Sequence, residues 1–224
     1  MNTRIVLVGP EYQQNIGYCC RVMKNFGFDE LFIVDPACKI GQEAVKYSKH
    51  AADVLKRARI AKNLEEATKG CSLIVGTTAI VNTGRDILRE CITLEEFARK
   101  MRKSKANIAL LMGREGTGLS REELEKCGVV VKIESNSEYG TLNLSHALAI
   151  ILYELSKDQY KPSVEFMDAN EMKLLQKYFN SFVDKNRKGI RSPSTIKLAF
   201  KRIINRGIKS RVEARALLHI LKKI

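Results

Sequence analysis

The chain has 224 residues, 45% of them hydrophobic, which is enough for one full domain and a smaller second one. Its longest apolar stretch, residues 142–155, is interrupted by polar side chains and is too short to span a membrane. No signal peptide precedes the first strand pattern. We therefore expect a cytoplasmic protein without a membrane segment. The formal net charge of +14 is concentrated in residues 161–224, which carry 16 Lys and Arg against 5 Asp and Glu, and this indicates a polyanionic partner, most often nucleic acid.

Apolar runs rich in β-branched residues alternate with helical patterns over the first 160 residues. The runs lie at residues 4–9, 30–35, 72–78, 107–113 and 129–133, and residues 58–62 are a candidate for a short edge strand. Such uninterrupted runs are typical of buried parallel strands. Capping boxes mark several helix starts, namely Asn63 with Glu66, Thr93 with Glu96 and Ser120 with Glu123. The alternation predicts an α/β fold with a mostly parallel sheet, whose ligands bind at the carboxyl ends of the strands.

After Tyr160 the pattern changes to helices alone. Helices are predicted over residues 170–186, 193–206 and 211–223, the last with a capping box of Ser210 and Glu213. We therefore expect a domain at 1–160, a linker at 161–168 and a small, basic helical extension at 169–224. Three helices in so few residues can bury only a thin core.

The segment NIALLMGREGTGLSREEL, residues 107–124, joins a strand to a capped helix through a glycine loop. Gly113 and Gly118 have the spacing of a nucleotide P-loop, but Leu119 stands where that loop needs a lysine. Glu115 would repel a phosphate, and the third glycine of a dinucleotide-binding fingerprint is missing. The loop therefore favours a small ligand that need not be anionic.

Two further loops after strands share this composition. Residues 75–80 contain Gly76 followed by two threonines, and residues 135–145 are dense in glycine, hydroxyl and amide groups. Each alone is typical of an ordinary turn. Because the three loops follow strands of one parallel sheet, we expect them to converge on one pocket.

Three stretches together resemble the motifs of a known enzyme family: NIGYCCRVMKNFG at 15–27, LLMGREGTGLSREEL at 110–124 and NSEYGTLNLSHA at 136–147. In order and spacing they are similar to those of the SPOUT class of RNA methyltransferases, and within it to the TrmJ family of tRNA 2′-O-methyltransferases. The resemblance implies a C-terminal trefoil knot in the α/β domain, a homodimer formed through that domain, and S-adenosylmethionine as cofactor. It also implies methyl transfer to a ribose 2′-hydroxyl of tRNA at nucleotide 32 of the anticodon loop. Another tRNA position, ribosomal RNA and a non-catalytic RNA-binding role are the alternatives.

The resemblance implies roles for individual residues as well. Cofactor contacts are implied for Thr77, Thr78, Ala79, Gly113, Ile133, Gly140, Thr141 and Leu142. Arg21 occupies the place of the catalytic arginine, and Asn15 and Asn143 are predicted to orient the ribose. Arg114 is expected to bind RNA backbone or to brace its loop, with Glu115 in a charge pair. The charge of the tail assigns RNA binding to Lys197, Lys201, Arg202, Arg206 and Lys209.

Two interpretations of Arg21 stay open: a phosphate clamp that also draws charge from the hydroxyl, and a general base. The clamp is favoured, because neutralising an arginine at pH 7 costs about 7–9 kcal/mol. The transfer requires no metal. Neither the three histidines nor the six cysteines have the spacing of a metal site, so we expect no metal and mostly buried free thiols.

Overall fold

The computed structural model describes residues 2–80, 87–102, 104–136, 139–159, 167–207 and 210–223. The chain divides into two compact units, Met1–Tyr160 and Lys161–Ile224, and each is described by itself. Lys209 and most of the predicted linker lie outside the described residues.

The described part of the first unit is built on one sheet of seven strands, in which every pairing is parallel. The strands are β1 (Asn2–Val8), β2 (Leu31–Val34), β3 (Arg59–Ala61), β4 (Leu73–Thr78), β5 (Ile92–Thr93), β6 (Asn107–Met112) and β7 (Val129–Lys132). Their order across the sheet is β3-β2-β1-β6-β4-β7-β5. The predicted α/β class and parallel sheet are confirmed. Strand β5 was not predicted, because two residues are too few to form a recognisable apolar run.

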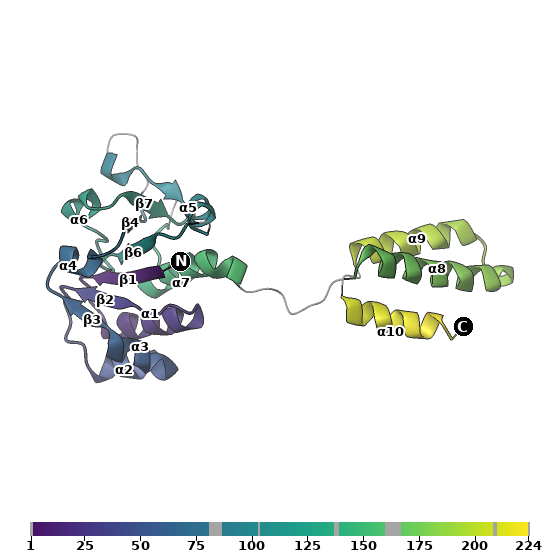
Figure 1. The fold of residues 1–224 in the computed structure, drawn as a ribbon, viewed down its shortest axis with the longest axis horizontal. Helices are drawn as coiled ribbons and strands as arrows, with labels where there is room; N and C mark the ends of the chain where they lie inside the picture. Colours follow the sequence, from purple (N-terminus) through teal and green to yellow (C-terminus); the bar gives the residue numbers. More distant parts are fainter. Residues whose placement is uncertain are drawn as a thin grey trace. The chain divides into compact units, whose positions relative to one another are not determined.

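Helices cover both faces of this sheet (Figure 1). They are α1 (Gln13–Asn25), α2 (Gln42–Ser48), α3 (Ala52–Arg57), α4 (Leu64–Thr68), α5 (Leu94–Met101), α6 (Arg121–Glu125) and α7 (Leu144–Ser156). Buried side chains of α1, α5 and α7 form one core with Ile5 and Leu7 of β1, whereas those of α4 and α6 form a second core with Val6 and Val8. Because both faces of β1 are covered, its sequence is apolar at consecutive positions.

The strand order brings three loops to one edge of the sheet. Gly76 of β4 is paired with Leu111 of β6 on one side and with Val130 of β7 on the other. The loops that follow these three strands therefore leave the same carboxyl edge of the sheet, which is where ligands of parallel sheets bind.

The second unit consists of three helices, α8 (Ala169–Lys185), α9 (Pro193–Arg206) and α10 (Arg211–Leu221), with a short helical turn, η4 (Arg187–Gly189), between the first two. Its core cluster is small and takes Leu175, Ile204 and Leu218 from the three helices in turn. The helix boundaries agree closely with the predicted ones, and the thin core agrees with the short length of this unit.

Capping at the helix starts of this unit differs from expectation. The predicted capping box at Ser210 is wrong, because the Ser210 side chain makes no capping hydrogen bond among the described residues. A capping box does form at Asp168 with Glu171, at the start of α8. Glu171 also pairs with Arg211 at 2.9 Å, and this ion pair ties the start of α10 to the start of α8.

Candidate active site

A pocket lies at the carboxyl edge of β4, β6 and β7. It encloses about 930 Å³ of empty space, counting the solvent at its mouth. All eight residues predicted to contact a cofactor line it, namely Thr77, Thr78, Ala79, Gly113, Ile133, Gly140, Thr141 and Leu142. The structure thus confirms that the three glycine- and hydroxyl-bearing loops converge on one pocket.

The loop after β6 folds back tightly on itself. The backbone N–H of Arg114 donates to the carbonyl oxygen of Gly118 at 3.2 Å, and the N–H of Gly118 donates back at 2.9 Å. Gly118 has φ +71°, a conformation that favours glycine. A Cβ on Gly113 would lie 2.3 Å from the backbone carbon of Gly118, so no larger residue fits there. The bare backbone of this loop consequently forms one wall of the pocket.

Hydroxyl groups hold the other two loops in place. Thr77 Oγ1 donates to the carbonyl oxygen of Leu111 at 3.0 Å, which ties the end of β4 to β6. Ser135 Oγ donates to the carbonyl oxygen of Gly140 at 3.1 Å, within the loop that precedes α7. These hydroxyls therefore act on the backbone that shapes the pocket.

Apolar side chains make up much of the pocket wall. Those that sequence reasoning missed are Ile80, Met112, Leu119, Leu124, Val131, Leu144, Ala147 and Ile151. They were missed because the apolar patterns that predict strands and helices do not separate a pocket wall from a core. Among the described lining residues, only Arg114 and Glu115 carry a charge. Such a wall suits an apolar ring with a few polar groups better than a triphosphate.

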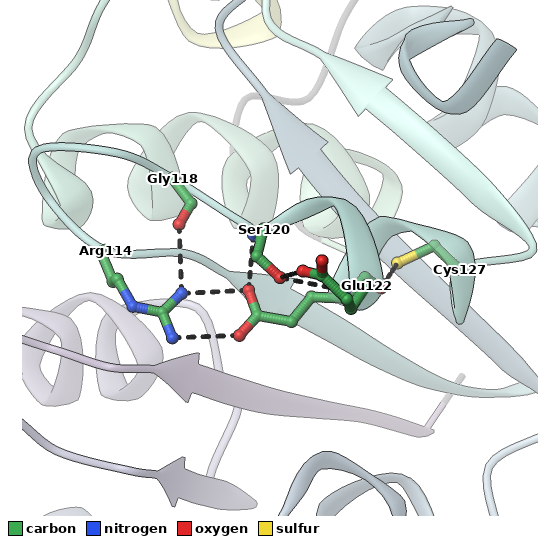
Figure 2. Close-up of polar contacts among 6 residues, drawn as sticks. Arg114, Gly118, Ser120, Glu122 and Cys127 are labelled. Atoms are coloured by element: carbon green, nitrogen blue, oxygen red, sulfur yellow. Dashed lines mark hydrogen bonds and ion pairs between the residues drawn. The ribbon is translucent and has the colours of Figure 1, made fainter. Parts of the chain in front are cut away.

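Arg114 is held in place by an ion pair, as Figure 2 shows. Its guanidinium donates to the two carboxylate oxygens of Glu123 at 3.0 and 3.1 Å, and this bidentate bond raises the pKa of Arg114. Glu123 also accepts from the Ser120 N–H in the predicted capping box that starts α6. A Cβ on Gly9 would lie 2.7 Å from Arg114 Nε, so the loop after β1 closes against the same side chain. This geometry supports the bracing role of Arg114, and its contact with RNA stays a prediction.

Glu115 belongs to a chain of hydrogen bonds that joins three segments. Its carboxylate accepts from the backbone N–H of Glu11 and from Asn15 Nδ2, each at 2.9 Å. Asn15 Oδ1 accepts from Asn143 Nδ2 at 3.0 Å, and Asn143 Oδ1 caps α7 by accepting from the Ser145 N–H at 2.9 Å. The charge pair expected for Glu115 is therefore wrong, because its partners among the described residues are neutral donors. The chain fixes the starts of α1 and α7 relative to the loop after β6.

Arg21 lies on α1 but apart from this chain of hydrogen bonds. Its side chain is exposed and makes no hydrogen bond or ion pair with any described residue. At 100° per residue it points about 120° away from Asn15 around the helix. It does not line the pocket. Within one chain, the structure thus brings Asn15 and Asn143 together, although neither lines the pocket, and leaves Arg21 elsewhere.

The predicted RNA-binding side chains of the tail that the structure describes lie on α9. Lys201, Arg202 and Arg206 are exposed. Lys197 is instead paired with Asp184, with its Nζ 2.6 Å from both carboxylate oxygens.

The cysteines of the chain are free thiols, and two of them, Cys19 and Cys20, are buried. Burial raises the pKa of Cys20 to about 12 and that of Cys127 to about 11, so both thiols are protonated at neutral pH. The described residues contain no group of three or more His, Cys, Asp or Glu placed to hold a metal ion. No described helix has the length and hydropathy needed to cross a membrane.

Comparison with known proteins places this architecture among methyltransferases. The sequence profile of the SpoU rRNA Methylase family matches residues 2–153. A Methanocaldococcus jannaschii protein named tRNA (cytidine-2′-O-)-methyltransferase TrmJ is 36% identical over 226 residues, which cover 97% of this chain and 97% of that protein. The crystal structure of TrmJ from Z. mobilis ZM4 matches with a TM-score of 0.71 at 26% identity, and the match covers 100% of this chain and 99% of that one. An AdoMet-bound rRNA methyltransferase from Sinorhizobium meliloti shares the fold, with a TM-score of 0.58 at 20% identity over 71% of this chain and 57% of that one.

Proposed function

Since the chain belongs to the SpoU rRNA methylase family, we propose that it transfers a methyl group from S-adenosylmethionine to a ribose 2′-hydroxyl of tRNA. The pocket formed by the three loops at the carboxyl edge of β4, β6 and β7 carries this proposal. A relative named as a tRNA 2′-O-methyltransferase matches the chain over almost its whole length, and this supports tRNA as the substrate class.

The residues of the pocket fit S-adenosylmethionine, which supplies a methyl group bonded to a sulfonium cation. Backbone groups around Ala79, Gly113 and Leu142 are available to hold the polar edges of the cofactor, and Ile133 lies among the apolar side chains that would enclose its ring. The only cationic side chain among the described lining residues, Arg114, is already paired with a carboxylate. A positively charged ligand would therefore meet no unpaired cationic side chain among the described residues that line the pocket.

The protein must orient the ribose and stabilise the negative charge that develops on its 2′-oxygen. We assign orientation of the ribose to Asn15 and Asn143. Glu115 holds the Asn15 amide through a hydrogen bond, and the Asn15 amide in turn holds the amide of Asn143. We assign charge stabilisation to Arg21, which binds the phosphate beside the target ribose and faces the oxygen through its N–H groups.

A homodimer explains how Arg21 reaches a pocket that it does not line in its own chain. Helix α7 exposes Ile150 and Tyr153, which are 40% and 54% exposed, and the Tyr153 ring packs edge-on against Phe26, the residue after α1, with the centroids 6.2 Å apart. This apolar face of α1 and α7 suits a second copy of the chain. Arg21 lies on the exposed side of α1 and would then serve the pocket of the partner copy. The trefoil knot in the first unit belongs to the same proposal and rests on the family resemblance.

The target nucleotide within tRNA is proposed to be nucleotide 32, on the resemblance of the three motifs to the TrmJ family. Mass-spectrometric nucleotide mapping of tRNA incubated with the protein and S-adenosylmethionine tests this directly. We expect one added methyl group on the ribose of nucleotide 32. Methylation at another tRNA position or only in ribosomal RNA would correct the target, and methylation of neither RNA would refute the enzymatic function.

The variant Arg21→Ala should abolish methylation while calorimetry still detects binding of S-adenosylmethionine. Near-normal turnover of this variant would remove Arg21 from the mechanism. Mixed dimers test whether the site is shared: Arg21→Ala is combined with a second inactive variant that cannot bind the cofactor. Activity returns in the mixture only if Arg21 of one copy serves the pocket of the other.

A further inference from the structure

The second unit contains an open groove between α8 and α9 that is lined by lysines. They are Lys173, Lys177 and Lys185 on α8, and Lys197 and Lys201 on α9. Among its described lining residues the groove has a single acidic side chain, Asp184. It encloses about 1650 Å³ of empty space, counting the solvent at its mouth.

Polar contacts on the floor of the groove fix its two walls relative to each other. Gln176 Nε2 donates to Asn180 Oδ1 at 2.8 Å and to the carbonyl oxygen of Lys197 at 3.3 Å, which links α8 to α9. Lys197 Nζ makes a second link, since it lies 2.6 Å from both carboxylate oxygens of Asp184. Asp184 is therefore neutralised inside the groove, and Lys173, Lys177 and Lys201 leave its walls positively charged.

The arrangement of the lysines suits a chain of phosphates better than a single anion. Lys173 and Lys177 are four residues apart on α8, so that they form a row along one wall with Cβ atoms about 5–6 Å apart. Lys201 lies on the opposite wall. A site for one phosphate would need these cations to converge on a point, whereas a row on one wall faced by a cation on the other can follow a backbone with charges at regular intervals.

We propose that the groove between α8 and α9 binds the sugar-phosphate backbone of RNA, with Lys173, Lys177 and Lys201 in contact with phosphates. This inference rests on the proposed function for the identity of the RNA, and it adds Lys173 and Lys177 of α8 to the residues that the charge of the tail predicted to bind RNA. Lys197 acts in it as a brace for the groove. Arg202 and Arg206 lie outside the groove lining.

The test compares two full-length variants that each remove two exposed charges from the second unit. The groove variant is Lys177→Gln with Lys201→Gln, one change on each wall. The matched control is Arg215→Gln with Lys223→Gln, at exposed positions of α10 and the residues after it, outside the groove. Fluorescence anisotropy measures the affinity for tRNA at several salt concentrations, and methyl transfer is measured in parallel.

Loss of two phosphate contacts should make the plot of log affinity against log salt less steep, with the magnitude of its slope reduced by about 1.4–1.8. It should also weaken binding roughly 10- to 30-fold at 0.15 M salt. The control should keep the wild-type slope. Equal effects in the two variants, or no effect in the groove variant, would overturn the groove assignment. So would a loss of binding to phosphatidylserine vesicles while tRNA binding is unchanged, since the groove would then serve a membrane.

The two proposals fail in different measurements. If the wild-type chain methylates tRNA but the groove variant binds it normally, the groove assignment is refuted and the enzymatic function stands. If the wild-type chain methylates no RNA while the groove variant selectively loses RNA binding, the enzymatic function is refuted and the groove assignment stands.

Discussion

The variant Glu115→Gln tests whether the hydrogen-bond chain through Asn15 holds the active site together. The carboxylate of Glu115 accepts two hydrogen bonds at 2.9 Å, one from the backbone of Glu11 and one from the Asn15 amide. The glutamine amide has the same shape but only one acceptor oxygen, so one N–H donor must face another donor. Losing one hydrogen bond to a charged acceptor costs about 1.5–3 kcal/mol. For a domain of this size, that loss lowers the unfolding midpoint by roughly 3–12 °C.

Activity should respond more strongly than stability, because Asn15 also fixes Asn143. Thermal unfolding and methyl-transfer kinetics measured on the same samples check both effects, with Glu125→Gln as a control at an exposed position of α6. We expect Glu115→Gln to lose turnover while the control keeps it. Wild-type stability together with wild-type turnover in Glu115→Gln would show that the chain of hydrogen bonds does not position the site.

Two further predictions concern the pocket loop and the buried thiols. Gly113→Ala should disturb the pocket wall at a cost of about 1–3 kcal/mol, or roughly 5- to 150-fold in S-adenosylmethionine affinity. The control Gly189→Ala lies outside the pocket lining, its Cβ would meet nothing within 4 Å, and it should bind normally in the same calorimetric titration. Burial raises the pKa of Cys20 from 9.0 to about 12, so the protonated thiol should resist iodoacetamide at pH 8 until the protein unfolds. The pKa of Cys20 is higher in the folded state than in the unfolded state. Its contribution to stability is therefore complete below pH 9 and is lost as the pH rises toward 12. In urea unfolding, the variant Cys20→Ala should not show this loss of stability at high pH. Rapid alkylation of the native protein at Cys20, or equal cofactor affinity in the two glycine variants, would contradict these predictions.

Local sequence patterns determined the class of fold and the place of the pocket. Runs such as residues 108–112 are apolar at every position, because their strands are covered on both faces, and they can therefore be recognised without a structure. Gly113 was named as a cofactor contact by the resemblance of residues 110–124 to a family motif, and its closeness to the backbone of Gly118 explains why this position needs glycine. The basic tail was equally visible, because net charge requires no knowledge of folding.

Only the tertiary structure decided which side chains pair. Asn15 and Asn143 are 128 positions apart, and Asn15 and Glu115 are 100 apart, so their hydrogen bonds depend on how α1, β6 and α7 are brought together. Lys197 could not be separated from Lys201 by sequence, although Asp184 neutralises the first and leaves the second exposed. Periodicity and capping patterns indicate which face of a segment is buried and where a helix begins. The partner of a polar group instead follows from the order of the strands and the packing of the helices, which depend on the whole chain.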